Sequence, residues 1–300
     1  MQVSGDSSDR VHLDFMKMSH IVYDRMGRGR PLVLLHGLGH RKEAWHPVLR
    51  TLAAEHDVIA PDLPGFGKSS APGRAEPYDI RWLVDSVAQF CERAGVERPH
   101  LVGNSLGGAI ALELGARGFA ASVTAFSPIG FTTVREGLFN RILTLGMWGA
   151  ARLPGQLLAA AAGTPPALAI ARRVLRGEEA EPSGPGPRFD TTAIAVGSPF
   201  TRLAPEVATY SFGPKELSCP VTIAWGRQDR VLAPRAARRA VERIRYARLV
   251  TLLGCGHVPM LDRPDLVAGV ILETTRAAVR ERRHPLPPMA PLAVPATVGA

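Results

Sequence analysis

A serine between two glycines is the strongest chemical signal in the chain. The stretch Gly103-Asn104-Ser105-Leu106-Gly107 follows a short apolar run and opens a segment of small residues with helical spacing. A Gly-x-Ser-x-Gly nucleophile turn needs this context, because its serine sits on a sharp bend between a strand and a helix. Glycine at 103 and 107 removes side chains that would collide with the neighbouring strand and helix. We therefore expect Ser105 to be a nucleophile whose hydroxyl stands above the edge of a sheet.

An earlier glycine-rich turn could supply the groups that stabilise negative charge on a reacting carbonyl. The sequence HGLG occupies residues 36–39, directly after the apolar run 32–35. Attack by a serine creates an oxyanion, which is stabilised by hydrogen-bond donors aimed at it. We expect these donors to be the backbone N–H groups of Leu38 and Leu106. His36 is expected to be a structural hydrogen-bonding residue.

A carboxylate and an imidazole follow two later apolar runs. Asp229 comes shortly after the run 221–225, and His257 comes shortly after the run 248–253. Ligands of open α/β sheets bind beyond the carboxyl ends of the strands, so we expect both side chains at one edge. Serine becomes a good nucleophile when a base removes its proton, and imidazole, with a pKa near 6.5, suits that role. We expect His257 to be the base for Ser105, and Asp229 to orient His257.

Other chemistries lack their motifs in this sequence. The stretch GFGKS at 65–69 is not a phosphate-binding loop, because the required earlier glycine falls at Asp62. No Gly-x-Gly-x-x-Gly follows an apolar run, and no His-Glu-x-x-His or Cys/His cluster has metal-ligand spacing. We therefore expect no metal and no cofactor. Asp262, which precedes Pro264, is expected to cap the N-terminus of the last helix.

The composition is that of a globular protein with a core. Of 300 residues, 46% are hydrophobic and 21% are charged, and the net charge is +9. The arginines are scattered, so the basic balance predicts neither a nucleic-acid partner nor a membrane partner. Three irregularly spaced cysteines do not make a disulfide framework, and the start of the chain lacks the apolar stretch of a signal peptide. We expect a soluble cytoplasmic enzyme and leave open whether it is a monomer or a homo-oligomer.

Alternating strands and helices must position these candidate residues. Short apolar runs typical of buried strands alternate with longer segments of helical spacing. Such alternation predicts an α/β fold, with a mostly parallel twisted sheet and helices on both faces. We expect strands near residues 32–35, 58–60, 101–103, 123–126, 221–225 and 248–253, and helices near 43–54, 79–94, 106–116, 234–245 and 264–280.

The alternation stops in the middle of the chain. Residues 130–212 hold apolar helix-like segments and breaks rich in proline and glycine. One break, at 177–188, is expected to be a mobile loop. The expected organisation is a leader at 1–18, an α/β core at 19–129 and 213–282, an insertion at 130–212 and a disordered proline-rich tail at 283–300.

Five motifs stand in order along the chain: HGLG (36–39), PDLPGFGKSS (61–70), GNSLGG (103–108), WGRQD (225–229) and GCGHVPMLDRP (254–264). Together they resemble those of the α/β-hydrolase family, which includes esterases, meta-cleavage C–C hydrolases and cofactor-free haloperoxidases. The resemblance spans about residues 19–128 and 218–280. It implies that Ser105, Asp229 and His257 are catalytic, and that the amides of Leu38 and Leu106 bind the oxyanion. Serine at position 105 sets the chain apart from haloalkane dehalogenases and epoxide hydrolases, which are similar but use an aspartate there.

The resemblance also implies that the insertion at 130–212 is a helical cap over a substrate pocket. Apolar side chains of such a cap would line a pocket for an acyl or aromatic group. We therefore expect a small-molecule substrate with an apolar acyl or aromatic part. The pocket residues expected on this basis are Gly37, Asn104, Phe131, Phe139, Met147 and Val258.

The expected reaction is hydrolysis of a carboxylic ester or a related acyl substrate through an acyl-enzyme. Two kinds of alternative stay open. The spelling GNSLGG is similar to that of meta-cleavage C–C hydrolases, although these usually carry a tryptophan directly after the catalytic histidine, where this chain has Val258. An acyltransferase, or a ligand-binding protein of the same fold with low turnover, is the other alternative.

Overall fold

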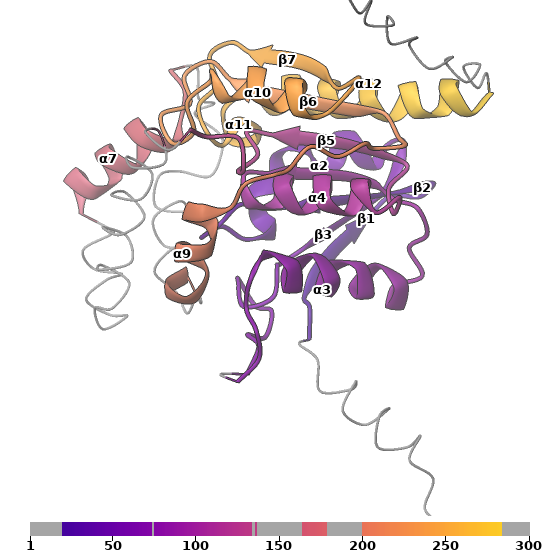
Figure 1. Ribbon diagram of the computed structural model, residues 1–300, viewed down its shortest axis with the longest axis horizontal. Helices are drawn as coiled ribbons and strands as arrows, with labels where there is room; N and C mark the ends of the chain where they lie inside the picture. The colour runs from indigo at the N-terminus through magenta and orange to yellow at the C-terminus, as the bar shows by residue number, and fades with distance from the viewer. Residues whose placement is uncertain (1–19, 74, 134–135, 137–163, 179–199, 284–300) are drawn as a thin grey trace, which may run out of the picture.

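The structure of the chain is a computed structural model that describes residues 20–73, 75–133, 136, 164–178 and 200–283 (Figure 1). The predictions for the leader and for most of the insertion lie outside these residues. The same holds for nearly all of the loop expected at 177–188 and of the tail expected at 283–300.

A seven-stranded sheet forms the centre of the described residues, with the strand order β1-β3-β2-β4-β5-β6-β7. Only β1 runs antiparallel to its neighbour; the other five pairings are parallel. The prediction of an α/β fold with a mostly parallel sheet is therefore confirmed. The strands are β1 (Tyr23–Met26), β2 (Arg30–Leu35), β3 (His56–Pro61), β4 (His100–Asn104), β5 (Ser122–Phe126), β6 (Val221–Gly226) and β7 (Arg248–Leu252).

Helices cover both faces of the sheet because alternate strand residues point to opposite sides. In β2, Val33 and Leu35 belong to a buried cluster that includes residues of α3, α4 and α10. Leu32 and Leu34 belong to a second cluster with residues of α2, α11 and α12. The helices are η1 (Lys42–Trp45), α2 (His46–Ala53), α3 (Ile80–Arg93), α4 (Leu106–Ala116), α7 (Pro165–Leu175), α9 (Phe200–Thr209), α10 (Ala236–Arg243), α11 (Pro259–Asp262) and α12 (Pro264–Arg283).

The carboxyl ends of the parallel strands meet at one edge of the sheet. In Figure 1, α7 and α9, which come from the insertion between β5 and β6, lie on that side, whereas α12 extends toward the opposite side. Loops that follow β2, β4, β6 and β7 are therefore neighbours at this edge. These are the loops that carry the predicted site residues.

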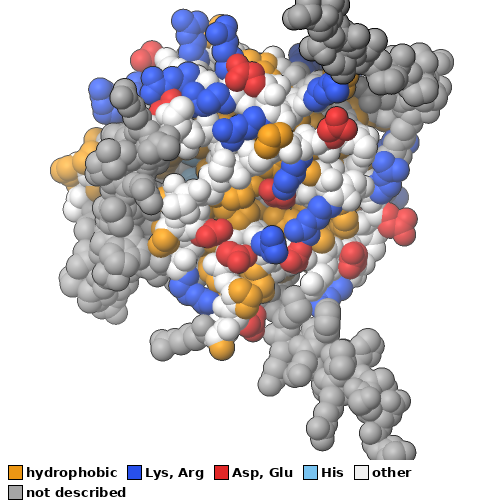
Figure 2. Space-filling view, in the orientation of Figure 1, with side chains coloured by type: hydrophobic (Ala, Val, Ile, Leu, Met, Phe, Trp, Pro, Cys, Tyr) orange, Lys and Arg blue, Asp and Glu red, His pale blue; other side chains and the backbone are white. Residues whose placement is uncertain are grey.

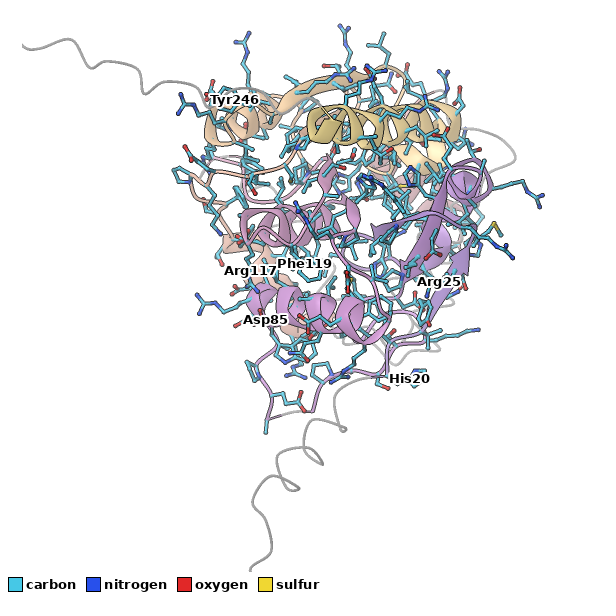
Figure 3. The ribbon with its side chains drawn as sticks, turned by 90° about the vertical axis from the view of Figure 1, so that its right-hand side faces the viewer. His20, Arg25, Asp85, Arg117, Phe119 and Tyr246 are labelled. Carbon is cyan, nitrogen blue, oxygen red and sulfur yellow. The ribbon has the colours of Figure 1, made fainter. Side chains whose placement is uncertain are left out.

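The surface of the described residues mixes both signs of charge. On the face shown in Figure 2, Lys and Arg side chains are interspersed with Asp and Glu. Arg117, which follows α4, forms an ion pair with Asp85 of α3 and so joins neighbouring helices (Figure 3). Within the described part of the chain, no helix has both the length and the apolar character needed to cross a membrane.

Candidate active site

Ser105 occupies the bend between β4 and α4. Its φ of 55° and ψ of −112° lie in a region that residues with side chains seldom adopt. A Cβ added to Gly103 would lie 2.1 Å from the carbonyl oxygen of Gly107, and one added to Gly107 would lie 2.2 Å from that of Leu35. Only glycine allows this close backbone approach. Strain of this kind costs about 1–3 kcal/mol and is concentrated at functional sites.

The loop after β2 lies directly against this bend. A Cβ added to Gly37 would lie 3.3 Å from the Cβ of Ser105 and 3.3 Å from Oδ1 of Asn104. Because Gly37 has no side chain, the backbone of the loop can come close to the serine. Gly37, expected in the substrate pocket, thus lies beside the expected nucleophile.

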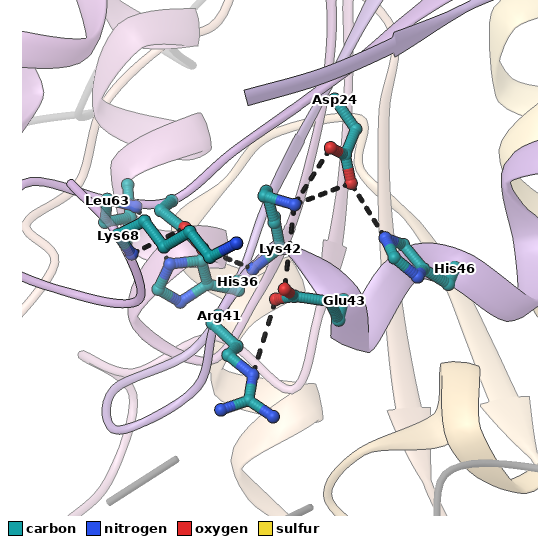
Figure 4. Close-up of polar contacts among 9 residues, drawn as sticks. Asp24, His36, Arg41, Lys42, Glu43, His46, Leu63 and Lys68 are labelled. Atoms are coloured by element: carbon teal, nitrogen blue, oxygen red, sulfur yellow. Dashed lines mark hydrogen bonds and ion pairs between the residues drawn. The ribbon is translucent and has the colours of Figure 1, made fainter. Parts of the chain in front are cut away.

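His36 holds this loop in place with both ring nitrogens. The backbone N–H of Leu63 donates to Nε2 of His36 at 2.9 Å, so the ring hydrogen lies on Nδ1, which donates to the Gly37 carbonyl at 2.8 Å. Burial lowers the pKa of His36, which favours this neutral ring. His36 therefore has the structural role expected from the sequence; Figure 4 shows it beside Leu63.

The carbonyl of Gly37 also determines the direction of the next amide. It accepts hydrogen bonds from His36 Nδ1 at 2.8 Å and from the backbone N–H of His40 at 3.1 Å. In a trans peptide the C=O and the following N–H point in opposite directions, so the N–H of Leu38 points away from these partners. Leu106 is the first residue of α4, where the backbone N–H has no acceptor within the helix.

His257 and Asp229 form a buried hydrogen-bonded pair. Nδ1 of His257 lies 2.9 Å from Oδ2 of Asp229, and both residues are at most 6% exposed. A carboxylate only accepts hydrogen bonds, so Nδ1 carries a hydrogen, and in a neutral imidazole ring the lone pair is then on Nε2. Oδ1 of Asp229 accepts from the backbone N–H groups of Val231 at 2.9 Å and Leu232 at 2.8 Å. The carboxylate is thus fixed on both oxygens.

Asn104 links the serine bend to the histidine loop. Its Nδ2 donates to the backbone carbonyl of His257 at 2.9 Å and to that of Phe126 at 3.2 Å. Asn104 directly precedes Ser105, so this side chain joins the end of β4 to the loop after β7. Asn104 was expected to line the pocket, and the structure shows its amide bridging two backbone carbonyls.

The loops after β6 and β7 are packed backbone to backbone. The N–H of Gln228 donates to the carbonyl of Cys255 at 2.9 Å. A Cβ added to Gly226 would lie 2.1 Å from the carbonyl oxygen of Gly256. This close approach brings Asp229 and His257 within hydrogen-bond distance although 28 positions separate them.

The remaining pocket candidates have different places. Phe131 is fully buried, and its ring centroid lies 5.5 Å from that of Phe212 in the cluster with α3 and α4. Val258 is buried in the cluster with α2 and α12. Phe139 and Met147 lie outside the described residues.

Asp262 does not cap the last helix, so that prediction is wrong. Asp262 is the last residue of α11. The residue directly before α12 is Arg263, and its carbonyl accepts the N–H of Val267. The carboxylate of Asp262 points inward instead and binds Arg176 of the insertion, with Nε 2.7 Å from Oδ1. No local pattern pairs two residues that are 86 positions apart, which is why the sequence did not reveal this contact.

A third buried histidine, His40, lies near the site. Burial lowers the pKa of His40 to about 3, and the surrounding His36, His257, Arg176 and Arg41 act in the same direction. Its imidazole is therefore neutral near pH 7. Within the described part of the chain, no group of three His, Cys, Asp or Glu residues could hold a metal ion.

Comparison with known proteins identifies the family of the chain. The model of the alpha/beta hydrolase family matches residues 32–270. A pimeloyl-(acyl-carrier protein) methyl ester esterase of Aeromonas hydrophila is 43% identical over 91 residues, which are 30% of this chain and 34% of that protein. The match thus spans about a third of that relative's length.

Two longer similarities cover most of the chain. A 2-hydroxymuconate semialdehyde hydrolase of a Pseudomonas species is 27% identical over an alignment of 274 positions, which covers 84% of this chain and 90% of that protein. The structure of a thermophilic esterase from Thermogutta terrifontis superposes with a TM-score of 0.70 and 21% identity, covering 86% of this chain and 93% of the other. Because the identity to the Thermogutta esterase is only 21%, this similarity shows a shared fold and nothing more.

Proposed function

Because the chain belongs to the α/β-hydrolase family, we propose that it is a serine hydrolase that cleaves a carboxylic ester or a related acyl substrate. The observation that carries this proposal is the buried 2.9 Å contact between His257 and Asp229, which Asn104 joins to the strained bend at Ser105. A nucleophile, a base and a group that orients the base then stand on three neighbouring loops.

Acylation is the first half of the proposed reaction. Oγ of Ser105 attacks the carbonyl carbon of the substrate while Nε2 of His257 takes the hydroxyl proton. The carbonyl oxygen becomes an oxyanion, which accepts hydrogen bonds from the N–H groups of Leu38 and Leu106. When the C–O bond to the leaving group breaks, His257 returns the proton to the departing alcohol. Ser105 is left as an acyl ester.

Deacylation uses the same groups, with water as the nucleophile and Oγ of Ser105 as the leaving group. Water attacks the acyl carbon, and Nε2 of His257 accepts one of its protons. The second oxyanion collapses, the bond to Oγ breaks, and the proton passes from His257 to Ser105. One water is consumed, and one alcohol and one carboxylic acid are released.

Asp229 orients and stabilises His257 in both acylation and deacylation. Its hydrogen bond keeps the proton of the neutral imidazole on Nδ1, so that Nε2 faces the reaction with a lone pair. When His257 becomes an imidazolium, the adjacent carboxylate stabilises its positive charge. The two backbone N–H groups on the other carboxylate oxygen keep Asp229 from turning away.

The proposed substrate is a small molecule with an apolar acyl or aromatic part. The relative from Aeromonas hydrophila is named as a methyl ester esterase, which favours ester substrates. We therefore propose simple p-nitrophenyl esters as the first substrates to test. Wild-type protein should hydrolyse them, and Ser105→Ala should lower kcat by about 10⁴-fold or more with the fold retained. Equal activity in the two proteins would contradict the mechanism.

Cleavage of a carbon–carbon bond is the second candidate. It is favoured by the similarity, over 84% of this chain, to a protein named as a 2-hydroxymuconate semialdehyde hydrolase. The discriminating measurement compares kcat/KM for a meta-cleavage product with kcat/KM for a p-nitrophenyl ester. A higher value for the meta-cleavage product would favour C–C cleavage over ester hydrolysis.

A further inference from the structure

The end of α7 is hydrogen-bonded to the loop that carries His257. The backbone carbonyl of Leu175, the last residue of α7, accepts the N–H of His257 at 2.9 Å and that of Val258 at 3.3 Å. The backbone of the proposed base therefore depends on a helix from the insertion. The same segment reaches the Asp229 loop, because the N–H of Glu178 donates to Oε1 of Gln228 at 2.7 Å.

Asp262 is the centre of this junction. Its Oδ2 accepts the N–H of Gly256 at 2.8 Å and that of Gly177 at 2.9 Å. Its Oδ1 accepts Nε of Arg176 at 2.7 Å, and the same guanidinium also donates to the carbonyl of Leu261. One carboxylate thus binds the residue before His257 and two residues beyond α7.

The charges at this junction are buried. The side chain of Asp262 is 0% exposed and that of Arg176 is 5% exposed. A buried ion pair is strongly favourable compared with either partner left alone, because the remaining charge would be unpaired away from water. The three hydrogen bonds to Asp262 are charge-assisted and hence stronger than neutral ones. Removal of either partner is therefore expected to disturb the Gly256–His257 backbone.

The backbones at the junction are in close contact. A Cβ added to Gly177 would lie 1.8 Å from the carbonyl oxygen of Gly254, and one added to Gly256 would lie 2.6 Å from the carbonyl carbon of Arg176. The His257 loop therefore cannot shift toward the end of α7, and a shift away from it would break the hydrogen bonds to Leu175 and those through Asp262.

We propose that Asp262 and Arg176 are positioning residues that act through His257. The Asp229 carboxylate orients the ring of His257, and the Asp262–Arg176 pair fixes the backbone from which that ring projects. The insertion thereby contributes directly to the geometry of the base. The inference rests on the proposed function of His257, and a displacement of about 1 Å at a catalytic group costs about 10²-fold in rate.

The test uses the full chain and two isosteric or charge-conserving changes, Asp262→Asn and Arg176→Lys. Asp262→Asn keeps the size of the side chain but leaves Arg176 without its carboxylate. Arg176→Lys keeps the charge that neutralises Asp262 but loses the planar fork that reaches both Asp262 and the Leu261 carbonyl. Matched controls are Asp265→Asn, at a carboxylate whose side chain is 73% exposed, and Arg172→Lys, at an exposed arginine of α7.

The measurement separates positioning from folding. A fluorophosphonate probe counts competent serines, and kcat for a p-nitrophenyl ester is expressed per labelled serine, so an unfolded fraction does not contribute. We expect kcat per labelled site to fall about 10- to 100-fold in Asp262→Asn and at least about fivefold in Arg176→Lys. KM should stay within about threefold in both variants, and both controls should match the wild type.

Each outcome decides between the two proposals. A wild type that neither labels nor turns over ester would contradict the proposed function and leave nothing for Asp262 to position. An active wild type whose variants lose less than about fivefold in kcat per site, or lose only in KM, would overturn the positioning role while the function stands. If Asp262→Asn does not fold, Arg176→Lys decides by the same limits.

Discussion

Nδ1 of His257 and Oδ2 of Asp229 lie 2.9 Å apart, while the other oxygen of Asp229 accepts two backbone N–H groups. The backbone therefore fixes the orientation of the Asp229 carboxylate independently of the imidazole. A base oriented in this way loses its correct tautomer when the carboxylate becomes an amide, because an amide can donate to Nδ1 as well as accept from it.

Asp229→Asn tests this relationship. We expect kcat for a p-nitrophenyl ester to fall about 10⁴-fold, since the wrong tautomer of His257 presents a hydrogen to Ser105 in place of a lone pair. Far-ultraviolet circular dichroism should be unchanged. Asp265→Asn, an exposed aspartate, is the control. A loss of less than about tenfold would show that Asp229 does not orient the base.

Gly37→Ala tests the approach of the β2 loop to the nucleophile. The added Cβ would lie 3.3 Å from both the Cβ of Ser105 and Oδ1 of Asn104, so the loop that carries the Leu38 amide must move. We expect kcat/KM to fall about 10- to 100-fold, with the free energy of unfolding changed by no more than about 1 kcal/mol. Gly213→Ala, where nothing lies within 4 Å of the added Cβ, should leave both quantities unchanged.

Gly103→Ala tests the packing of the strained bend. Its Cβ would meet the Gly107 carbonyl oxygen at 2.1 Å, and backbone cannot yield as a flexible side chain can. We expect a loss of about 3 kcal/mol or more in the free energy of unfolding, measured by urea denaturation. Gly269→Ala in α12, with nothing within 4 Å, should instead gain about 0.5–1 kcal/mol. Similar stability of the two variants would contradict the packing seen at the bend.

Because His40 is buried, we expect the free energy of unfolding to fall in acid. Burial lowers its pKa to about 3 in the folded chain, whereas an unfolded histidine titrates near 6.5. Between these values the unfolded state binds more protons, so the stabilising contribution is present above about pH 6.5 and is lost as the pH falls toward 3. The slope is at most about 1.4 kcal/mol per pH unit.

The variant His40→Gln should remove this contribution. Urea denaturation at about pH 7 and about pH 5 should show a smaller acid loss in the variant than in the wild type, by about 1–2 kcal/mol. His20→Gln, at an exposed histidine labelled in Figure 3, is the control. An equal acid loss in wild type and His40→Gln would show that His40 is not the group that titrates.

Most of the sheet could be predicted because its central strands are buried on both faces. The runs at 101–103 and 123–126 are parts of β4 and β5, whose residues are buried without exception. The strand β1 was not predicted. Three of its four residues are exposed, so neither a continuous apolar run nor an alternating pattern marks it, and its pairing with β3 at the sheet edge sets its conformation.

Some residues of the candidate site could also be predicted from the sequence, and others could not. Ser105, Asp229 and His257 could be proposed because each stands in a short motif after a strand. Asp262 and Arg176 could not be paired, because their contact arises only when the insertion folds back on the loop after β7. The role of Asn104 as a bridge to His257 likewise depends on strands that are adjacent only in the folded sheet.

The most direct test of Ser105 as the nucleophile is to locate a covalent adduct. The wild-type chain is incubated with a fluorophosphonate probe, digested, and analysed by mass spectrometry, beside Ser105→Ala and His257→Gln. We predict one adduct on the peptide that contains Ser105, none in Ser105→Ala, and labelling slowed by about 10³-fold or more in His257→Gln. An adduct on another residue, or labelling of Ser105 at an unchanged rate in His257→Gln, would contradict this prediction.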